Sequence, residues 1–152
     1  MKENKSRIII GSDHAAYLLK EKIKTCLIEK HGIDIADAGT YGEKSVDYPD
    51  FGSKVALAVS NGEFERGILL CGTGIGMSMV ANRFSHVRAA LCNDVFSAMM
   101  SRRHNNSNIL VMGGRVIGDV LAEEIVNVWL NTPFEGGRHQ MRLEKFDTVQ
   151  GG

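Results

Sequence analysis

The apolar residues of this chain follow two periods that alternate along its length. Five short runs consist mostly of apolar and β-branched residues, at 7–10, 33–36, 68–71, 88–92 and 109–112. Short runs of this kind, ended by glycine or polar residues, are typical of strands that are buried on both faces. We therefore expect five strands at these positions.

The segments between the strands carry apolar residues at three- and four-residue steps, as Leu19 and Ile23 do in the first of them. This spacing places the residues on one helix face. Gly32 is a candidate C-cap, Pro49 suits a first helical turn, and Asn93-Asp94 are candidate N-caps. We expect helices at about 14–31, 48–61, 75–82, 95–104 and 116–130.

Strand and helix alternate five times, which predicts parallel pairing with right-handed crossovers and helices on both faces of the sheet. The expected fold is α/β, a single doubly wound Rossmann-like domain with a five-stranded parallel sheet. Neither a linker nor a repeat divides the chain. We therefore assign residues 1–152 to one domain, with a core at about 7–131 and a tail at about 132–152.

The tail departs from the alternation of strand and helix. Thr132-Pro133 ends the last core helix, and Arg138 and Arg142 are four residues apart, hence on one face if this piece is helical. A short amphipathic segment beyond a complete sheet needs a surface to pack on. A second subunit is a natural candidate, and a solvated C-terminal arm is the alternative.

Composition narrows the functional classes. The chain has 152 residues, 18 Lys+Arg and 18 Asp+Glu, so its formal net charge is zero, which argues against a nucleic-acid or acidic-membrane binder. No apolar stretch approaches the roughly 20 residues of a membrane span, and the first residues lack the apolar core of a signal peptide. Three widely spaced cysteines fit neither a disulfide framework nor a zinc motif, so a reducing cytoplasm is the simplest expectation.

The most informative motif is an apolar run that ends on Cys71 and continues into a glycine-alternating loop, Gly72-Thr73-Gly74-Ile75-Gly76. A thiol at a helix start is a candidate base or nucleophile. The loop exposes backbone N–H groups that suit an anion. Its spacing differs from the dinucleotide-binding fingerprint G-x-G-x-x-G, which argues against a nicotinamide cofactor. A tight turn without a ligand remains the alternative.

Further polar residues follow the other strands. Open parallel sheets bind ligands at the carboxyl ends of their strands. Asp13 and His14 follow the first strand, and Arg115 follows the fifth. Asn93 and Asp94 follow the fourth, with His104 and Asn105 beyond the next helix. We expect several of these side chains to converge on one rim.

Charged side chains divide into candidates for anion binding and ordinary surface groups. Arg115, Arg138 and Arg142 could jointly hold a phosphate dianion, whereas Arg102 and Arg103 fit solvated charge at a helix end. No histidine or carboxylate cluster has metal-ligand spacing in the sequence. A metal-free acid–base site is therefore the starting hypothesis, with no cofactor.

Five separated segments together resemble the type B ribose-5-phosphate isomerases, in a wider group that also includes galactose-6-phosphate and allose-6-phosphate isomerases. The resemblance runs from about residue 7 to residue 145. The segments that carry it are Gly11-Ser12-Asp13-His14, Asp47-Tyr48-Pro49, Cys71-Gly72-Thr73-Gly74-Ile75-Gly76, Ser101-Arg102-Arg103-His104-Asn105-Asn106 and Glu135-Gly136-Gly137-Arg138-His139-Gln140-Met141-Arg142.

The resemblance implies a metal-independent aldose–ketose isomerisation of ribose 5-phosphate and ribulose 5-phosphate through an enediolate. It implies Cys71 as the proton-transfer base, where some members have a glutamate instead, and His104 as the group that assists ring opening. The remaining implied roles are oxyanion stabilisation by Thr73 and the N–H groups of Gly72, Gly74, Ile75 and Gly76, sugar contacts by Asp13, Tyr48 and Asn105, and phosphate contacts by His14, Arg115, Arg138 and Arg142.

The resemblance also implies a homodimer whose sites are built from both subunits, with a tetramer left open, and with no nucleic-acid or membrane partner. Two alternatives remain. A hexose 6-phosphate isomerase on the same scaffold would need more room beside the loop at 39–47, and a non-catalytic protein could use the same rim to bind a sugar phosphate.

Overall fold

A computed structural model describes residues 7–149, and the expectation about a signal peptide concerns a terminus that lies largely outside them. All the strands are parallel, and they form a single sheet in the order β2-β1-β3-β5-β4. The strands are β1 (Arg7–Ser12), β2 (Asp34–Asp37), β3 (Arg66–Cys71), β4 (Ala89–Leu91) and β5 (Ile109–Gly113). The predicted five-stranded parallel sheet is therefore confirmed.

The helices also follow the predicted alternation. They are α1 (Tyr17–His31), α2 (Tyr48–Ser60), α3 (Ile75–Ala81), α4 (Val95–Arg103), α5 (Asp119–Asn131) and α6 (Arg138–Asp147). The helix predicted from residue 14 opens instead with a 3-10 turn, η1 (His14–Ala16), because the Asp13 carboxylate accepts from Ala16 N. Within residues 7–149 no helix combines the length and apolar composition of a membrane span.

One helix boundary was predicted too early. The helix expected from residue 116 begins only at Asp119. Val116 N and Ile117 N both donate to Gly113 O, at 3.0 and 3.1 Å, and this turn delays the helix. Three expected end signals are confirmed: Gly32 closes α1 in the left-handed region at φ 62°, Pro49 lies in the first turn of α2, and the Asp94 carboxylate caps α4.

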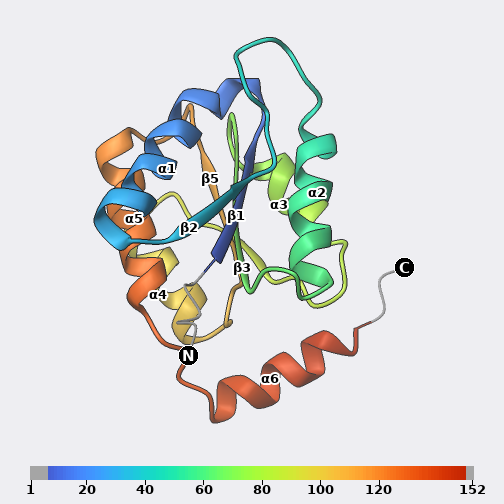
Figure 1. Cartoon of the computed structure of the whole chain (residues 1–152). Coiled ribbons are helices and arrows are strands. Elements are labelled where there is room, and N and C mark those ends of the chain that lie inside the picture. Colours follow the sequence, from blue (N-terminus) through green and yellow to red (C-terminus); the bar gives the residue numbers. More distant parts are fainter. Residues whose placement is uncertain (1–6, 150–152) are drawn as a thin grey trace, which may run out of the picture.

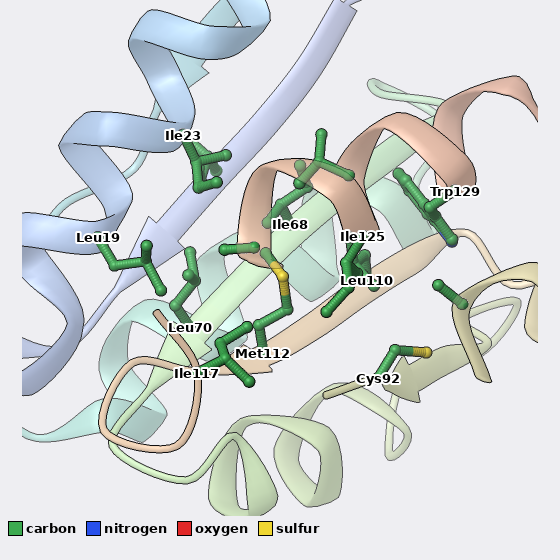
Figure 2. Packing of buried hydrophobic residues seen from close by; sticks show 14 of the residues in the cluster. Leu19, Ile23, Ile68, Leu70, Cys92, Leu110, Met112, Ile117, Ile125 and Trp129 are labelled. Carbon is green, nitrogen blue, oxygen red and sulfur yellow. The ribbon is translucent and has the colours of Figure 1, made fainter. Parts of the chain in front are cut away.

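Helices cover both faces of the sheet, with α1, α4 and α5 on one side and α2 and α3 on the other (Figure 1). The side chains of β3 alternate between these layers. Ile68 and Leu70 pack with α1 and α5, as Figure 2 shows, whereas Leu69 and Cys71 pack beneath α2 and α3. Burial on both faces explains the continuous apolar runs of the sequence.

The carboxyl ends of the parallel strands form one edge of the sheet, called here the carboxyl edge, and their amino ends form the amino edge. At the carboxyl edge the chain leaves β1, β3 and β5 through Ser12, Cys71 and Gly113. At the amino edge Asn108 accepts from Gly67 N at 2.9 Å and donates its own N–H to Arg88 O at 3.0 Å, which joins the starts of three strands. A helix that connects parallel strands must run from the first edge to the second.

A buried ion pair anchors the carboxyl edge. The ammonium of Lys20 is fully buried on α1 and donates to both carboxylate oxygens of Asp37, at 2.6 and 2.7 Å. Lys24 donates to the same carboxylate at 2.8 Å, and Gly39 N donates to it at 2.9 Å. The pair therefore fixes the start of the loop between β2 and α2.

That loop is also bonded to the end of β1. Ser12 N donates to Gly39 O and Thr40 N donates to Ser12 O, each at 2.8 Å. The last strand residue before Asp13 is thus held by the same segment that the buried ion pair holds. Through this connection the ion pair supports the residues that follow β1.

Replacing Asp37 with asparagine should leave Lys20 as a buried charge without a carboxylate. We expect Asp37→Asn to lower the free energy of unfolding at pH 7 by about 3 kcal/mol, measured by urea denaturation. Burial acts to raise the pKa of Asp37, but hydrogen bonds from Lys20 and Lys24 lower it overall below its usual value of 3.8.

The pH dependence has a definite sign. Because the folded-state pKa of Asp37 is the lower one, its stabilisation is present above pH 3.8 and is lost as the pH falls through the folded-state pKa. Wild type should therefore lose more stability between pH 6 and pH 3 than Asp37→Asn does. The control is Asp119→Asn, which breaks an exposed pair with Lys22. Equal pH profiles for wild type and Asp37→Asn would contradict the assignment.

Candidate active site

Cys71 is the last residue of β3, and the residue is only 5% exposed beneath α2 and α3. Its carbonyl accepts from Gly114 N at 2.9 Å, so the exits from β3 and β5 are joined directly at the carboxyl edge. The thiol therefore stands on a rigid element at the edge where ligands bind in open parallel sheets.

The loop after Cys71 needs glycine for steric reasons. Gly74 has a φ of 82°, and a Cβ there would lie 2.5 Å from the Cδ1 atom of Leu91. Gly113 at the end of β5 packs on the same loop, since a Cβ at this position would lie 2.6 Å from Thr73 O. The glycines thus bring the backbone of the loop close against β5.

Not every N–H group of the loop is available to a ligand. Ile75 N donates to the Thr73 hydroxyl at 3.2 Å, so this N–H, an expected oxyanion donor, already has a partner. Thr73 keeps its own hydroxyl proton for donation. Because α3 has only seven residues, the anion-binding capacity of the loop rests on individual N–H groups more than on a helix dipole.

Asp13 and His14 lie beside this loop. Asp13 N donates to Leu70 O at 3.2 Å, one residue before Cys71, and one Asp13 carboxylate oxygen is occupied by Ala16 N. His14 Nδ1 accepts from Val46 N at 3.1 Å. A ring nitrogen that accepts carries no proton, so in the neutral ring the proton is on Nε2, where it can be donated to a ligand.

Tyr48 and Arg115 flank the glycine loop on two sides. A Cβ on Gly76 would lie 2.6 Å from the Tyr48 ring, and a Cβ on Gly72 would lie 3.7 Å from Nη1 of Arg115. Arg115 N also donates to Gly72 O at 2.9 Å. The structure therefore brings six of the expected site residues together at the carboxyl edge. We name this set the thiol cluster; it consists of Asp13, His14, Tyr48, Cys71, Thr73 and Arg115.

Asn93 and Asp94 also lie at this edge but are occupied by the backbone. The Asn93 amide oxygen accepts from Gly113 N at 3.1 Å. The Asp94 carboxylate accepts from Ser97 N at 2.6 Å and from the Ser97 hydroxyl at 2.8 Å. Both side chains hold the turn between β4 and α4.

His104 and Asn105 do not join the thiol cluster, and the expectation that they share its rim is wrong. They follow α4, which begins at the carboxyl edge and carries the chain about 14 Å over nine residues to the amino edge. Asn106 and Asn108, just beyond them, bond to Arg88 at the start of β4. Within one chain, His104 and Cys71 therefore lie at opposite edges of the sheet.

The two tail arginines lie on α6, which confirms that the segment is helical. In Figure 1, α6 lies at the end of the molecule opposite the loop between β2 and α2, set apart from the helices that flank the sheet. Arg138 and Arg142 are exposed, and so are the apolar side chains of Met141 and Phe146. We name His104, Asn105, Arg138 and Arg142 the histidine–arginine cluster.

A buried arginine holds the histidine–arginine cluster to the body of the protein. Arg102 is 6% exposed, so the interpretation of this residue as solvated helix-end charge is wrong. Its guanidinium donates to Ser107 O at 2.5 Å, to the Asn106 side chain at 3.0 Å and to Thr132 O at 3.3 Å. Burial and the nearby Arg66 lower the pKa of Arg102 to about 10, which leaves it charged at neutral pH.

Two residues next to His104 were not singled out from the sequence. The His139 ring stacks on the His104 ring, with centroids 4.2 Å apart and planes 12° from parallel, and the Glu135 carboxylate lies 3.5 Å from His139 Nε2. The available signal was the four-residue spacing of Glu135 and His139. Their contact with His104 joins segments that are distant in the chain.

These three side chains could together bind a metal ion, since their ligand atoms lie within 4.8 Å of one another. Sequence spacing gave no sign of this group. The surroundings are cationic, however: Arg138 and Arg142 act on His139, and Arg103 lies 4.0 Å from Glu135. Such a field favours an anion over a divalent cation.

The other two cysteines belong to the hydrophobic core. Cys26 and Cys92 are buried and unpaired. Burial raises the pKa of both thiols, that of Cys92 to about 11, so they are protonated at neutral pH. Cys71 is thus the cysteine that lies beside the other polar side chains of the thiol cluster.

Comparison with known proteins agrees with this geometry. The profile of the ribose/galactose isomerase family matches residues 8–146. Ribose-5-phosphate isomerase B of Escherichia coli is 45% identical over 95% of this chain and 96% of its own. D-erythrulose-4-phosphate isomerase of Pectobacterium atrosepticum is 44% identical over 91% of each chain.

A solved structure gives the same result for the fold. The crystal structure of a ribose 5-phosphate isomerase from Thermotoga maritima superposes with a TM-score of 0.91 at 54% identity, covering 95% of this chain and 99% of the other. The sequence profile, the curated relatives and the superposition span nearly the whole described fold. The chain belongs to the ribose/galactose isomerase family.

Proposed function

We propose that this chain interconverts ribose 5-phosphate and ribulose 5-phosphate, as the names of the Escherichia coli and Thermotoga maritima relatives indicate for those proteins. One observation carries the proposal: the thiol of Cys71 ends a central strand beside a loop of backbone N–H groups, with Asp13 and His14 on the adjacent strand end. A base beside an oxyanion site is what proton transfer next to a carbonyl requires.

In the proposed reaction the Cys71 thiolate removes the proton from C2 of the open-chain aldose. The electron pair forms the C1–C2 double bond of an enediolate, and the carbonyl oxygen takes up negative charge. Thr73 and the free N–H groups of the glycine loop donate to that oxygen. The thiol then returns the proton to C1 as the C2 carbonyl forms, and the O2 proton passes to O1, which becomes the C1 hydroxyl of the ketose.

Ribose 5-phosphate is mostly a ring in water, so it must open before this step. We assign ring opening to His104, which donates a proton to the ring oxygen as the bond between C1 and that oxygen breaks. The anomeric hydroxyl releases its proton to solvent as the C1 aldehyde forms, and Asn105 contacts the sugar. Asp13 and Tyr48 orient the hydroxyl groups. No step needs a metal ion or an organic cofactor.

The active unit in this proposal is a homodimer. Cys71 and His104 lie at opposite edges of one sheet, so a site that uses both must take them from two chains. His14 and Arg115 of one chain and Arg138 and Arg142 of the other would hold the phosphate. The exposed Met141 and Phe146 on α6 provide apolar surface for the contact. We place the enzyme in the cytoplasm, where its unpaired cysteines would stay reduced.

A shorter substrate is the second candidate, and the name of the Pectobacterium atrosepticum relative favours it. That relative acts on a four-carbon sugar phosphate. A hexose 6-phosphate remains the longer alternative. Comparing kcat/KM for the four-, five- and six-carbon aldose phosphates separates these possibilities, and a tenfold preference for another length would replace the pentose assignment.

Removing the thiol tests the proposed base. We expect Cys71→Ala to lower kcat for ribose 5-phosphate by about 10²–10⁴-fold, because no other group of the thiol cluster replaces the base. Calorimetry should show nearly unchanged affinity for ribitol 5-phosphate, which has no carbonyl and cannot isomerise. Cys26→Ala, which removes a buried thiol on α1, is the control. Unchanged turnover in Cys71→Ala would exclude the base.

A substrate that cannot form a ring tests the assignment of His104. In erythrose 4-phosphate the C4 oxygen is esterified, so no five-membered ring closes. We expect His104→Ala to lower kcat/KM for ribose 5-phosphate by about 10²-fold and to leave that for erythrose 4-phosphate within about twofold of wild type. An equal loss on both substrates would contradict a specific role in ring opening.

A further inference from the structure

His104 receives its orientation from another ring. Within residues 7–149 its imidazole makes no hydrogen bond, although its backbone N–H donates to Met100 O at 2.9 Å. One ring face is covered by His139, at a centroid distance of 4.2 Å and an interplanar angle of 12°. Face-to-face contact restricts rotation of His104 about its side-chain bonds.

His139 is held more firmly than the ring it covers. Its side chain is 7% exposed, and Nε2 lies 3.5 Å from the Glu135 carboxylate. Its backbone N–H donates to Gly136 O at 3.1 Å, and Glu135 N donates to Arg103 O at 3.1 Å. The support for His139 is therefore bonded to the residue that immediately precedes His104.

We propose that His139, fixed by Glu135, is a positioning residue that holds the His104 imidazole in the orientation required for ring opening. This inference rests on the proposed function. His139 does not touch the reacting atoms and acts through His104 alone.

The electrostatic surroundings disfavour a charge on His139. Two stacked imidazoles do not readily carry positive charge together. Burial, His104, Arg138 and Arg142 lower the pKa of His139, and Glu135 opposes them only in part. The pKa of His139 therefore lies below its usual value of 6.5, which keeps its ring neutral at neutral pH.

The decisive comparison uses both substrates and two variants. His139→Ala removes the stack, whereas His139→Phe keeps a flat neutral ring. We expect His139→Ala to lower kcat/KM for ribose 5-phosphate by roughly fivefold to tenfold, with erythrose 4-phosphate unaffected, and His139→Phe to restore most of the loss. Gln140→Ala, at the next and exposed position of α6, is the control. Equal losses on both substrates, or no loss, would overturn the proposal.

A measurement without substrate separates this inference from the proposed function. In the nuclear magnetic resonance spectrum of wild type, the stack should shift the His104 ring protons upfield. The shift should be lost in His139→Ala and kept in His139→Phe. Its absence in wild type would overturn the positioning role even if isomerisation occurs, whereas its presence in a protein that turns over neither substrate would refute only the proposed function.

The same side chains must also be tested as a metal site. Activity on ribose 5-phosphate should survive extensive dialysis against a chelator. A loss confined to ribose 5-phosphate, restored by Zn²⁺, would overturn the positioning role and identify His104, Glu135 and His139 as ligands instead.

Discussion

Every strand of the sheet runs in the same direction, so each connecting helix must carry the chain back from the carboxyl edge to the amino edge. This constraint decides where chemistry can occur. Residues at or just after the end of a strand, such as Cys71 and Arg115, gather at one edge. Residues that follow a helix, such as His104 and Arg138, gather at the other. The thiol cluster and the histidine–arginine cluster are therefore separated by the fold itself, and a second copy of the chain is the simplest way to unite them.

A buried cation stabilises each edge, and neither cation takes part in the proposed reaction. At the carboxyl edge Lys20 is neutralised by Asp37, which holds the loop that is bonded to the end of β1. At the amino edge Arg102 has carbonyl and amide acceptors, and it fixes both the turn after α4 and the start of the tail. Both cations lie on helices and bond to the segments next to the candidate site residues. Rigid placement of those residues follows from this arrangement.

Local sequence pattern was sufficient to predict the strands, most helices and the glycine loop, because burial on both faces and the need for φ near 82° at Gly74 leave direct signs in residue type. It was insufficient to place His104 at the amino edge, because the prediction did not take into account that α4 carries the chain from one edge of the sheet to the other. His139, Glu135, Lys20 and Asp37 were missed for a related reason. Their roles arise from contacts between elements, as in the pairing of His139 with His104 and of Lys20 with Asp37.

The central claim, that each active site combines two chains, is tested most directly by mixing two inactive variants. Cys71→Ala and His104→Ala are each purified, shown to be nearly inactive on ribose 5-phosphate, then unfolded and refolded together in equal amounts. A mixed dimer has one site with both native residues, so the mixture should recover about a quarter of the wild-type rate. If each site were built within one chain, every site would keep one substitution, and recovery no greater than that of either variant refolded alone would contradict the account.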